Sequence, residues 1–380
     1  MTVKSLSNNT DPIRLLQNLG VDSGGVNILA SKSKIYFIEI NGLKVGGANI
    51  LKQDALSIGA DLAVPRGTVV AATPKVNCLL IATAKQLKLL SHKELAQPFG
   101  LKEVAYKLQN ILKVQTPTSF DIMGIINAND DSFFNDSRFL GNDAISKIES
   151  MIEEGASIID IGGVSSRPNA PIVSEKEELL RVSPILDLIA KNRLYEHTKF
   201  SIDSYTPSVI SKALESGFNI VNDITGFGND AVCKLTAEYN ATAIIMHMQG
   251  TPQTMQNSPK YSSLLDEIYS FFEERIEKAS SFGVKDIVLD LGIGFGKSLE
   301  DNLSLIKNIE SFLTLDKQIL IGASRKSMID KISSSKVQER LSGTIALHLE
   351  AYKNGASILR VHDVKEHLQA LRVYEALKKV

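Results

Sequence analysis

The chain has 380 residues with 42 basic and 43 acidic side chains, which gives a formal net charge of −1. This balance argues against a protein that binds DNA or RNA through its overall charge, because nucleic acid selects strongly basic surfaces. Hydrophobic residues make up 43% of the chain, which is enough to form a core and excludes an intrinsically disordered protein. The length predicts one large domain together with a smaller one.

The cysteines and the apolar segments indicate the compartment. Cys78 and Cys233 stand far apart and form no Cys-x-x-Cys pair, so neither a disulfide framework nor a structural zinc site is indicated. Residues 1–16 lack the apolar segment of a signal peptide, and no apolar run approaches the roughly 18 residues that a transmembrane helix needs. We therefore predict a cytoplasmic protein without a membrane partner.

The first 115 residues are predicted to form a small α/β extension. Strand-like runs lie at Ile35–Ile38 and Cys78–Ile81, and a helical pattern from Gln86 to Lys113 is interrupted near Pro98. Reactive residues do not gather in this part, so the sequence assigns it no chemistry. A polar segment with a proline, residues 115–119, separates it from the rest of the chain.

Residues 119–380 contain eight short apolar runs, each followed by a longer helical stretch. The runs are Asp121–Asn127, Ser157–Gly163, Phe200–Ser204, Ile220–Thr225, Ala241–Met248, Asp286–Asp290, Gln318–Gly322 and Ser357–Val361. Several are apolar at nearly every position, as strands buried on both faces must be. This alternation predicts an α/β fold, a (β/α)8 TIM barrel, with an open doubly wound sheet as the alternative.

Polar residues end nearly every one of these runs. They are Asn127, Asp160, Asp203, Asn222 with Asp223, His247, Asp290, Ser324 to Lys326, and Arg360 with His362 and Asp363. A barrel gathers all eight carboxyl ends around one mouth, where active sites lie, whereas an open sheet spreads them along an edge. The positions of the polar residues therefore favour the barrel.

Three of these strand ends suggest the ligand. Asp203, Asn222 and Asp290 offer two carboxylates and an amide, a set that suits a flat heterocycle with ring N–H donors. Each of them alone could equally cap a helix or satisfy loop backbone. Their occurrence at three separate strand ends favours a binding site.

The last strand ends suggest an anion and a cation beside the heterocycle. Ser324–Ser327 and Arg360–His362 follow the seventh and eighth predicted strands, after which barrels commonly bind phosphate. A solvated basic turn is the alternative. Asn127 and the acidic pair Asp130–Asp131 could hold magnesium near that anion, although such loops are more often solvated turns.

Two apparent motifs fail. Gly292–Gly294 does not complete the pattern Gly-x-Gly-x-x-Gly, because Lys297 occupies the position of the third glycine. Gly294–Ser298 ends like a phosphate-binding loop, but Leu291 stands where that loop requires glycine, so we expect only a tight turn with the backbone closely approached. The histidines show no metal-binding spacing. Four of them are predicted to be surface or packing residues, namely His92, His197, His348 and His367.

Taken together, these strand ends resemble the dihydropteroate synthase family, the pterin-binding barrels of folate biosynthesis. The resemblance runs from about Phe120 to the end of the chain and is specific in the combination and order of its segments. The segments are Gly124–Asn127 with Asp131–Phe133, Ile158–Pro168, Ser201–Ser204, Val221–Ile224, Met246–Pro252, Leu289–Lys297, Ser324–Met328 and Arg360–Val364.

The resemblance implies a transferase that condenses hydroxymethyl-dihydropterin pyrophosphate with p-aminobenzoate, with Mg²⁺ as cofactor. It implies that Asp203, Asn222 and Asp290 hold the pterin, with Lys326 beside it and Met246 in the wall. It assigns the pyrophosphate and magnesium to Asn127, Arg360 and His362, and the p-aminobenzoate pocket to Ser166, Arg167, Pro168 and Ser327. Phe295 and Val361 complete the expected substrate contacts, and the expected catalytic residues are Asp203, Asp290 and Lys326. A homodimer and sensitivity to sulfonamides are further family expectations.

The chain departs from the family pattern at several positions. Residues 128–130 lack the family's proline, Val164 replaces a glutamate, Ser166 replaces a threonine, and Leu291 replaces a proline. Ser166 keeps a hydroxyl, and we expect the changes around Asn127 to bear on magnesium binding and loop closure. Two alternatives therefore stay open, a methyltetrahydrofolate-dependent methyltransferase and a synthase homologue without catalysis, although the Ser324 and Arg360 segments favour a pyrophosphate substrate and no corrinoid domain is apparent.

Overall fold

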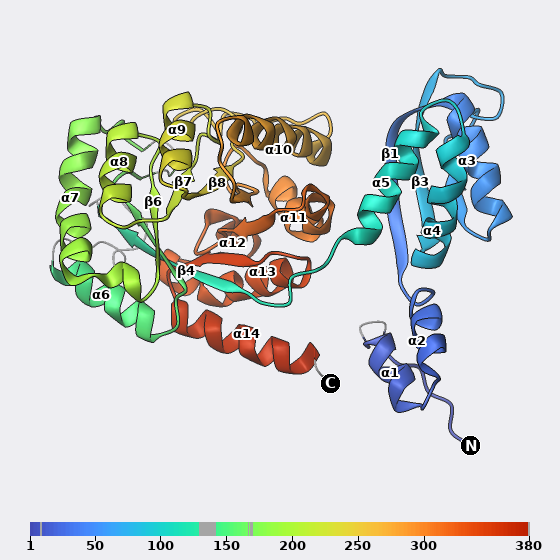
Figure 1. Ribbon diagram of the computed structural model, residues 1–380, viewed down its shortest axis with the longest axis horizontal. Helices are drawn as coiled ribbons and strands as arrows, with labels where there is room; N and C mark the ends of the chain where they lie inside the picture. The colour runs from blue at the N-terminus through green and yellow to red at the C-terminus, as the bar shows by residue number, and fades with distance from the viewer. Residues whose placement is uncertain (8–9, 129–141, 166, 168–169, 379–380) are drawn as a thin grey trace. The chain divides into compact units, whose positions relative to one another are not determined.

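The chain forms two compact units, Met1–Gln115 and Thr116–Leu377. The computed structural model describes residues 1–7, 10–128, 142–165, 167 and 170–378 (Figure 1). The predicted positions Asn129 to Asp131, Ser166 and Pro168 lie outside these residues.

The N-terminal unit is a three-stranded antiparallel sheet with helices. Its strands, in the order β1-β3-β2, are β1 (Ile35–Lys44), β2 (Asp61–Ala63) and β3 (Lys75–Thr83). Its helices are α1 (Pro12–Asn18), α2 (Ser23–Ala30), α3 (Val45–Ser57), α4 (Ala84–Lys93) and α5 (Leu101–Lys113), with a 3₁₀ turn at Glu94–Ala96. Alternate β3 side chains, among them Cys78 and Leu80, are buried with Leu51, Leu87 and Leu101 in a core of the unit's own.

The second unit is a closed barrel of eight parallel strands, which confirms the predicted fold. Each strand pairs with the next along the chain, and the last pairs with the first. The strands are β4 (Asp121–Asn127), β5 (Ile158–Gly162), β6 (Lys199–Asp203), β7 (Ile220–Asp223), β8 (Thr242–Met246), β9 (Ile287–Asp290), β10 (Gln318–Ile321) and β11 (Ile358–Val361).

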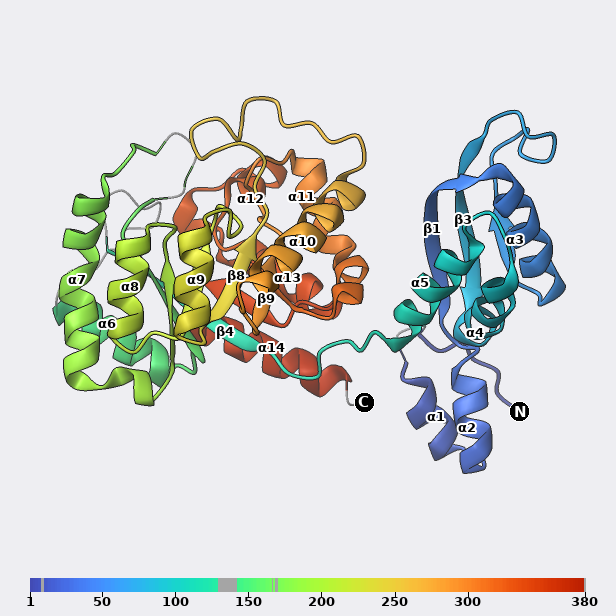
Figure 2. The same ribbon diagram turned by 45° about the horizontal axis from the view of Figure 1, so that its top comes forward.

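Helices alternate with the strands and surround them (Figure 2). They are α6 (Asn142–Glu153), α7 (Glu175–Asn192), α8 (Pro207–Glu215), α9 (Asp230–Glu238), α10 (Leu264–Ser281), α11 (Leu299–Lys307), α12 (Ser327–Ile332), α13 (Leu341–Lys353) and α14 (Val364–Lys378). Short 3₁₀ segments lie at Leu194–Glu196, Ile309–Leu315 and Val337–Glu339. In the described part of the chain, none of the helices combines the length and the hydrophobicity of a membrane span.

The barrel interior is built in layers. One layer is apolar and consists of Met123, Ile158, Ile220, Ile244, Val288, Leu320 and Ile358, one from each of seven strands. Because strand side chains alternate between two faces, the residues two positions further also face the interior. These are Ile125, Asp160, Asn222, Met246, Asp290, Gly322 and Arg360. Asp203 joins this layer, since it pairs in register with Asn222, so the carboxyl ends of the strands present a polar layer above an apolar one.

Candidate active site

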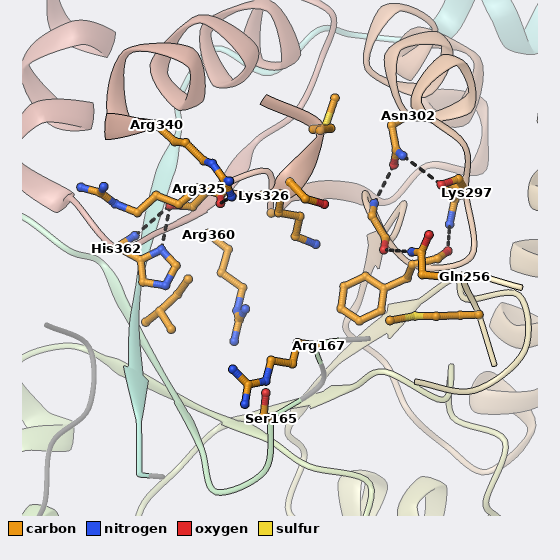
Figure 3. Close-up of a pocket in the computed structure, with 18 of the residues that line it drawn as sticks. Ser165, Arg167, Gln256, Lys297, Asn302, Arg325, Lys326, Arg340, Arg360 and His362 are labelled. Atoms are coloured by element: carbon orange, nitrogen blue, oxygen red, sulfur yellow. Dashed lines mark hydrogen bonds between the residues drawn. The ribbon is translucent and has the colours of Figure 1, made fainter. Parts of the chain in front are cut away.

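A cavity opens at this mouth of the barrel, and its walls are rich in positive charge. Figure 3 shows Arg360 and Lys326 pointing into it, with Arg167 and Ser165 across from Arg360. Its basic lining residues are Arg167, Lys297, Arg325, Lys326, Lys331, Arg340 and Arg360, whereas Asp203 is the one acidic residue among the lining side chains that the structure describes. Such a wall favours a ligand with an anionic group.

Arg360 joins two carboxylates across the barrel. Its Nε donates to Asp160 Oδ2 at 2.6 Å, and its Nη2 donates to Asp203 Oδ2 at 2.7 Å. The Asn222 amide donates to the same oxygen of Asp160 at 3.2 Å. Asp160 is fully buried, so this arginine is the direct counter-ion of a charge that water does not reach.

The carboxyl groups of Asp203 and Asp290 both have raised pKa values. Burial raises the pKa of Asp203 to about 7; Arg360 opposes this, and the neighbouring carboxylates Asp160, Glu178 and Asp290 add to it. Burial also raises the pKa of Asp290, whereas the hydrogen bond that its carboxylate accepts from the Gly292 backbone N–H at 2.8 Å lowers it. Excess carboxylate charge in a buried place is relieved by a ligand that is positive or donates hydrogen bonds.

Lys326 connects the loops after β9 and β10. It stands at the N-cap of α12, and its Nζ donates to the Ile293 carbonyl and lies 4.2 Å from the ring centroid of Phe295. Burial lowers its pKa to about 8, with Asp290 acting in the opposite direction. Its ammonium therefore lines the cavity within electrostatic reach of Asp290 and Asp203.

Lys297 fixes the loop after β9 from inside. Its Nζ lies 3.0 Å from His247 Nδ1, 3.2 Å from the His247 carbonyl, and 3.0 Å from the carbonyls of both Gly292 and Phe295. Burial lowers the pKa of Lys297 to about 7, and Asp290 opposes the shift. Four acceptors around one nitrogen favour the ammonium, which has three hydrogens to donate.

The tight turn expected in this loop is present. Gly292 has a φ of 64°, and a Cβ built on it would lie 1.9 Å from the His247 carbonyl oxygen. Only glycine fits such an approach at such a φ. The glycines that resemble a phosphate loop thus press the chain against the end of β8.

The loops after β10 and β11 meet through side chains. Ser324 Oγ lies 2.8 Å from His362 Nδ1 and accepts from the His362 backbone N–H at 3.3 Å. Burial, with Arg360, lowers the pKa of His362 to about 3, so its ring is neutral. If the serine hydroxyl donates to Nδ1, the ring hydrogen lies on Nε2.

The structure gathers most of the residues predicted for the site. Those that line the cavity are Asn127, Arg167, Asp203, Phe295, Lys326, Ser327, Arg360 and His362. Asn222, Met246 and Asp290 are buried in the interior layer. Val361 is fully buried and follows the inward-facing Arg360, so alternation turns its side chain away from the cavity, and its contact with substrate stays a prediction.

Some members of the site were given no role from the sequence. Asp160 could have been found, because it lies two positions after an apolar inward residue, as Asn222 and Asp290 do. The ion pair between Asp160 and Arg360 could not have been predicted from this spacing, because the two residues are 200 positions apart in the chain. Lys297 gave no signal, because a buried lysine depends on carbonyl groups that only the folded loop brings together.

The cavity wall contains one candidate donor for magnesium. Among the described residues, no group of three or more His, Cys, Asp or Glu side chains could hold a metal ion. Magnesium commonly takes only one or two protein oxygens and completes its shell with phosphate and water. The amide of Asn127, in the cavity wall, is a donor of that kind, so the residues fit a substrate-bridged ion.

Known proteins identify the family. Residues 123–362 match the family described as pterin binding enzyme. The chain is 41% identical over 379 residues to a bifunctional dihydropteroate synthase/dihydropteroate reductase of Helicobacter pylori, with 100% of this chain and 99% of that protein covered. The chain belongs to the dihydropteroate synthase family.

Solved dihydropteroate synthases share the barrel. The Yersinia pestis enzyme in complex with a sulfonamide drug has a TM-score of 0.66 at 35% identity, over 69% of this chain and 96% of its own. The Xanthomonas albilineans enzyme with 4-aminobenzoic acid has a TM-score of 0.63 at 32% identity, over 69% and 94%. Membership of this family confirms the predicted transferase of folate biosynthesis and supports it over the methyltransferase and the non-catalytic homologue.

Proposed function

We propose that this chain joins hydroxymethyl-dihydropterin pyrophosphate to p-aminobenzoate and releases pyrophosphate. The observation that carries the proposal is the polarity of the barrel mouth, where the buried carboxylates Asp203 and Asp290 stand beside the cations Arg360 and Lys326. The substrate has the matching polarity, because its ring becomes positive while its diphosphate leaves as an anion.

The carboxylates serve the pterin. When the bond between the methylene carbon and the diphosphate oxygen breaks, the electron pair leaves with the diphosphate, and the dihydropterin delocalises the positive charge. The carboxyl groups of Asp203 and Asp290 are proposed to stabilise the positive charge of the transition state electrostatically, without a protein nucleophile. Asn222 and Met246, in the same interior layer, are proposed to contact the ring.

The opposite side serves the departing diphosphate. Arg360, Lys326 and the Nε2–H of His362 are proposed to donate to its oxygens, as preorganised donors that cost no rearrangement during the reaction. Magnesium, when bound, would neutralise part of the diphosphate charge. Asn127 would hold it from the protein side.

The amine then completes the exchange. The nitrogen of p-aminobenzoate forms a bond to the methylene carbon and loses one proton to water. Arg167 and Ser327 line the cavity and are proposed to shape the p-aminobenzoate pocket, together with Ser166 and Pro168, which lie outside the described residues. The 4-aminobenzoic acid complex of the Xanthomonas albilineans relative supports such a pocket.

The test is direct synthesis. The purified full chain is incubated with hydroxymethyl-dihydropterin pyrophosphate, p-aminobenzoate and Mg²⁺, and both pyrophosphate and dihydropteroate are measured. We expect the two products in equal amounts and a rate that EDTA abolishes. Pyrophosphate without dihydropteroate, or neither product, would contradict the proposal; a rate that survives EDTA would contradict the magnesium assignment alone.

A second function is favoured by the lengths of the matches. The two synthase structures cover 69% of this chain, whereas the relative named as both synthase and reductase covers all of it, including the N-terminal unit. We propose that the chain also reduces dihydropteroate. That step adds a hydride and a proton to the remaining C=N bond of the pterin ring, and the hydride must come from a reduced nicotinamide or flavin.

This second function has its own test. The full chain and residues 116–380 alone are each given dihydropteroate with reduced nicotinamide, with and without added flavin. We expect oxidation of the nicotinamide with the full chain only, while both proteins retain synthase activity. Oxidation by neither protein would remove the reductase and leave the synthase proposal standing.

The assembly and the location stay predictions. The family leads us to propose a homodimer in the cytoplasm. Light scattering of the purified chain at several concentrations would give the mass of a dimer, and the mass of a monomer throughout would contradict it.

A further inference from the structure

Two histidines that the sequence assigns to surface or packing form a buried pair next to the mouth. His348 on α13 and His367 on α14 are each 1% exposed. His348 Nε2 accepts a hydrogen bond from the backbone N–H of Ala323 at 3.0 Å, and its Nδ1 lies 3.0 Å from His367 Nε2. Ala323 directly precedes Ser324, so the pair touches the loop after β10.

The other end of the pair holds the loop after β11. His367 Nδ1 lies 2.6 Å from the carbonyl oxygen of Asp363, the residue after His362. The chain of hydrogen bonds is therefore directional: the Ala323 N–H requires an unprotonated Nε2 on His348, and the Asp363 carbonyl requires a hydrogen on His367 Nδ1. Each ring carries one hydrogen, and burial lowers the pKa of both.

An ion pair between Arg325 and Asp363 links the same two loops. The Asp363 carboxylate accepts from Arg325 Nε at 3.0 Å and from Nη2 at 2.7 Å. Arg325 has a φ of 55°, and its backbone N–H donates to Thr344 Oγ1 at 2.9 Å. The loops after β10 and β11 are thus joined through the histidine pair at one place and through Arg325 and Asp363 at another.

The linked loops carry the anion-facing groups. Ser324 lies between the linked residues Ala323 and Arg325, and its partner His362 directly precedes Asp363, where both links end. Lys326 and Arg360 are each two positions from this contact in the chain and line the cavity. Removal of the pair would free one end of each loop without substituting any side chain that lines the cavity. Donors that must meet two phosphates at once depend on such spacing.

We infer that His348 and His367 are positioning residues that fix the spacing between the loops after β10 and β11 and thereby set the affinity for a diphosphate. The inference rests on the proposed synthase reaction, because that reaction supplies the diphosphate. Binding of inorganic pyrophosphate nevertheless tests the inference without turnover. The loop groups that touch p-aminobenzoate in the proposal lie mainly after other strands, so the effect should be confined to one substrate.

The experiment compares two substitutions at one position in the full chain. Glutamine can accept from the Ala323 N–H and donate to His367 with one amide, whereas leucine can do neither. For His348→Leu we expect inorganic pyrophosphate, measured by calorimetry with Mg²⁺, to bind about tenfold more weakly, and the KM for the pterin pyrophosphate to rise similarly. The KM for p-aminobenzoate should change less than twofold, and His348→Gln should restore most of the pyrophosphate affinity.

Tyr352→Phe is the matched control. Tyr352 lies one turn further along α13 and donates to Glu375 at 2.7 Å, away from the two loops, so its loss should leave pyrophosphate affinity unchanged. Unchanged pyrophosphate affinity in His348→Leu would overturn the inference, as would an equal rise of both KM values or no recovery in His348→Gln. A wild-type chain that binds pyrophosphate but makes no dihydropteroate would instead refute the proposed function.

Discussion

The barrel and the N-terminal unit differ in where they place buried polar groups. In the barrel, Asp160, Asn222, Asp290 and Arg360 occupy equivalent interior positions on different strands, and parallel closure brings them to one mouth. Each polar residue is therefore a neighbour of the others, however far apart they are in the chain. The mouth combines charge, burial and a cavity.

The N-terminal unit has no such convergence in its described residues. Its paired strands β1 and β3 run antiparallel, so the carboxyl end of one strand lies beside the amino end of the other. Its buried polar residues are Thr68 in a loop, Ser91 in α4 and Glu94 in a 3₁₀ turn. The comparison teaches that strand direction, more than composition, decides whether scattered polar residues become a site.

The largest effect is expected at the centre of the mouth. Arg360→Met leaves Asp160 and Asp203 buried without their counter-ion, which should lower the free energy of unfolding of the barrel by about 3–5 kcal/mol. Urea unfolding followed by circular dichroism measures it, together with loss of synthase activity. The control is Lys353→Met, which removes an exposed ion pair with Glu350 in the same unit and should cost less than about 1 kcal/mol. A similar loss in both variants would remove the special role of the interior layer.

A smaller effect is expected at the edge of the cavity. Lys326→Ala should lower kcat by roughly 10²–10³, the range for loss of one preorganised donor. Lys331→Ala serves as the control, since it also lines the cavity but is exposed on α12, and its kcat should stay within about threefold, in keeping with the small effect of a solvated charge. Steady-state kinetics with both substrates decides this. Equal kcat values for the Lys326 variant and the wild type would remove Lys326 from its role.

The loop after β9 should respond more mildly. Lys297→Met removes the ammonium that four acceptors share, so the loop that carries Phe295 should lose its fixed position. We expect kcat/KM for the pterin pyrophosphate to fall about 10-fold to 10²-fold, because misplacement of about 1 Å has effects of that order. Lys297→Arg, which keeps the charge but not the fit, should lie between. Retention of full activity in the methionine variant would contradict the positioning role.

The smallest effect concerns the N-terminal unit and depends on pH. Burial, with Asp54, raises the pKa of Glu94 to about 7. A carboxyl whose pKa is raised on folding stabilises the fold below its unfolded value of 4.5, and this contribution is lost as the pH rises through about 7. The unfolding temperature of this unit should therefore fall between pH 5 and about 8, and Glu94→Gln should flatten that dependence. The same pH dependence in the unfolding temperature of the barrel would contradict this assignment, because Glu94 lies in the N-terminal unit.

Much of the fold followed from local patterns. The predicted strand Asp121–Asn127 has the observed bounds. Glycines with positive φ follow four helix ends, where a left-handed residue commonly ends a helix, namely Gly155, Gly217, Gly283 and Gly355. The strand predicted to reach Thr225 ends at Asp223 instead, because the Asp223 carboxylate accepts from the Thr225 and Phe227 backbone N–H groups and turns the chain. Such a side-chain turn competes with the strand and leaves no trace in hydrophobic periodicity.

The parts of the site that depend on the positions of residues along the strands could be predicted from the sequence. The parts that depend on contacts between distant segments could not. Asp203, Asn222 and Asp290 stand at strand ends, which the sequence marks. The pairing of Arg360 with Asp160, and the hydrogen bonds of Lys297 and the histidine pair, arise from segments that only closure of the barrel brings together.

The most direct test of the account is the synthase rate of residues 116–380 beside that of the full chain. Each unit has its own core, and relatives of barrel length are folded proteins. We predict dihydropteroate formation at rates within about twofold of each other, since every group of the mouth lies in the barrel. A folded barrel that makes no dihydropteroate, while the full chain does, would contradict the claim that the mouth is sufficient for the reaction.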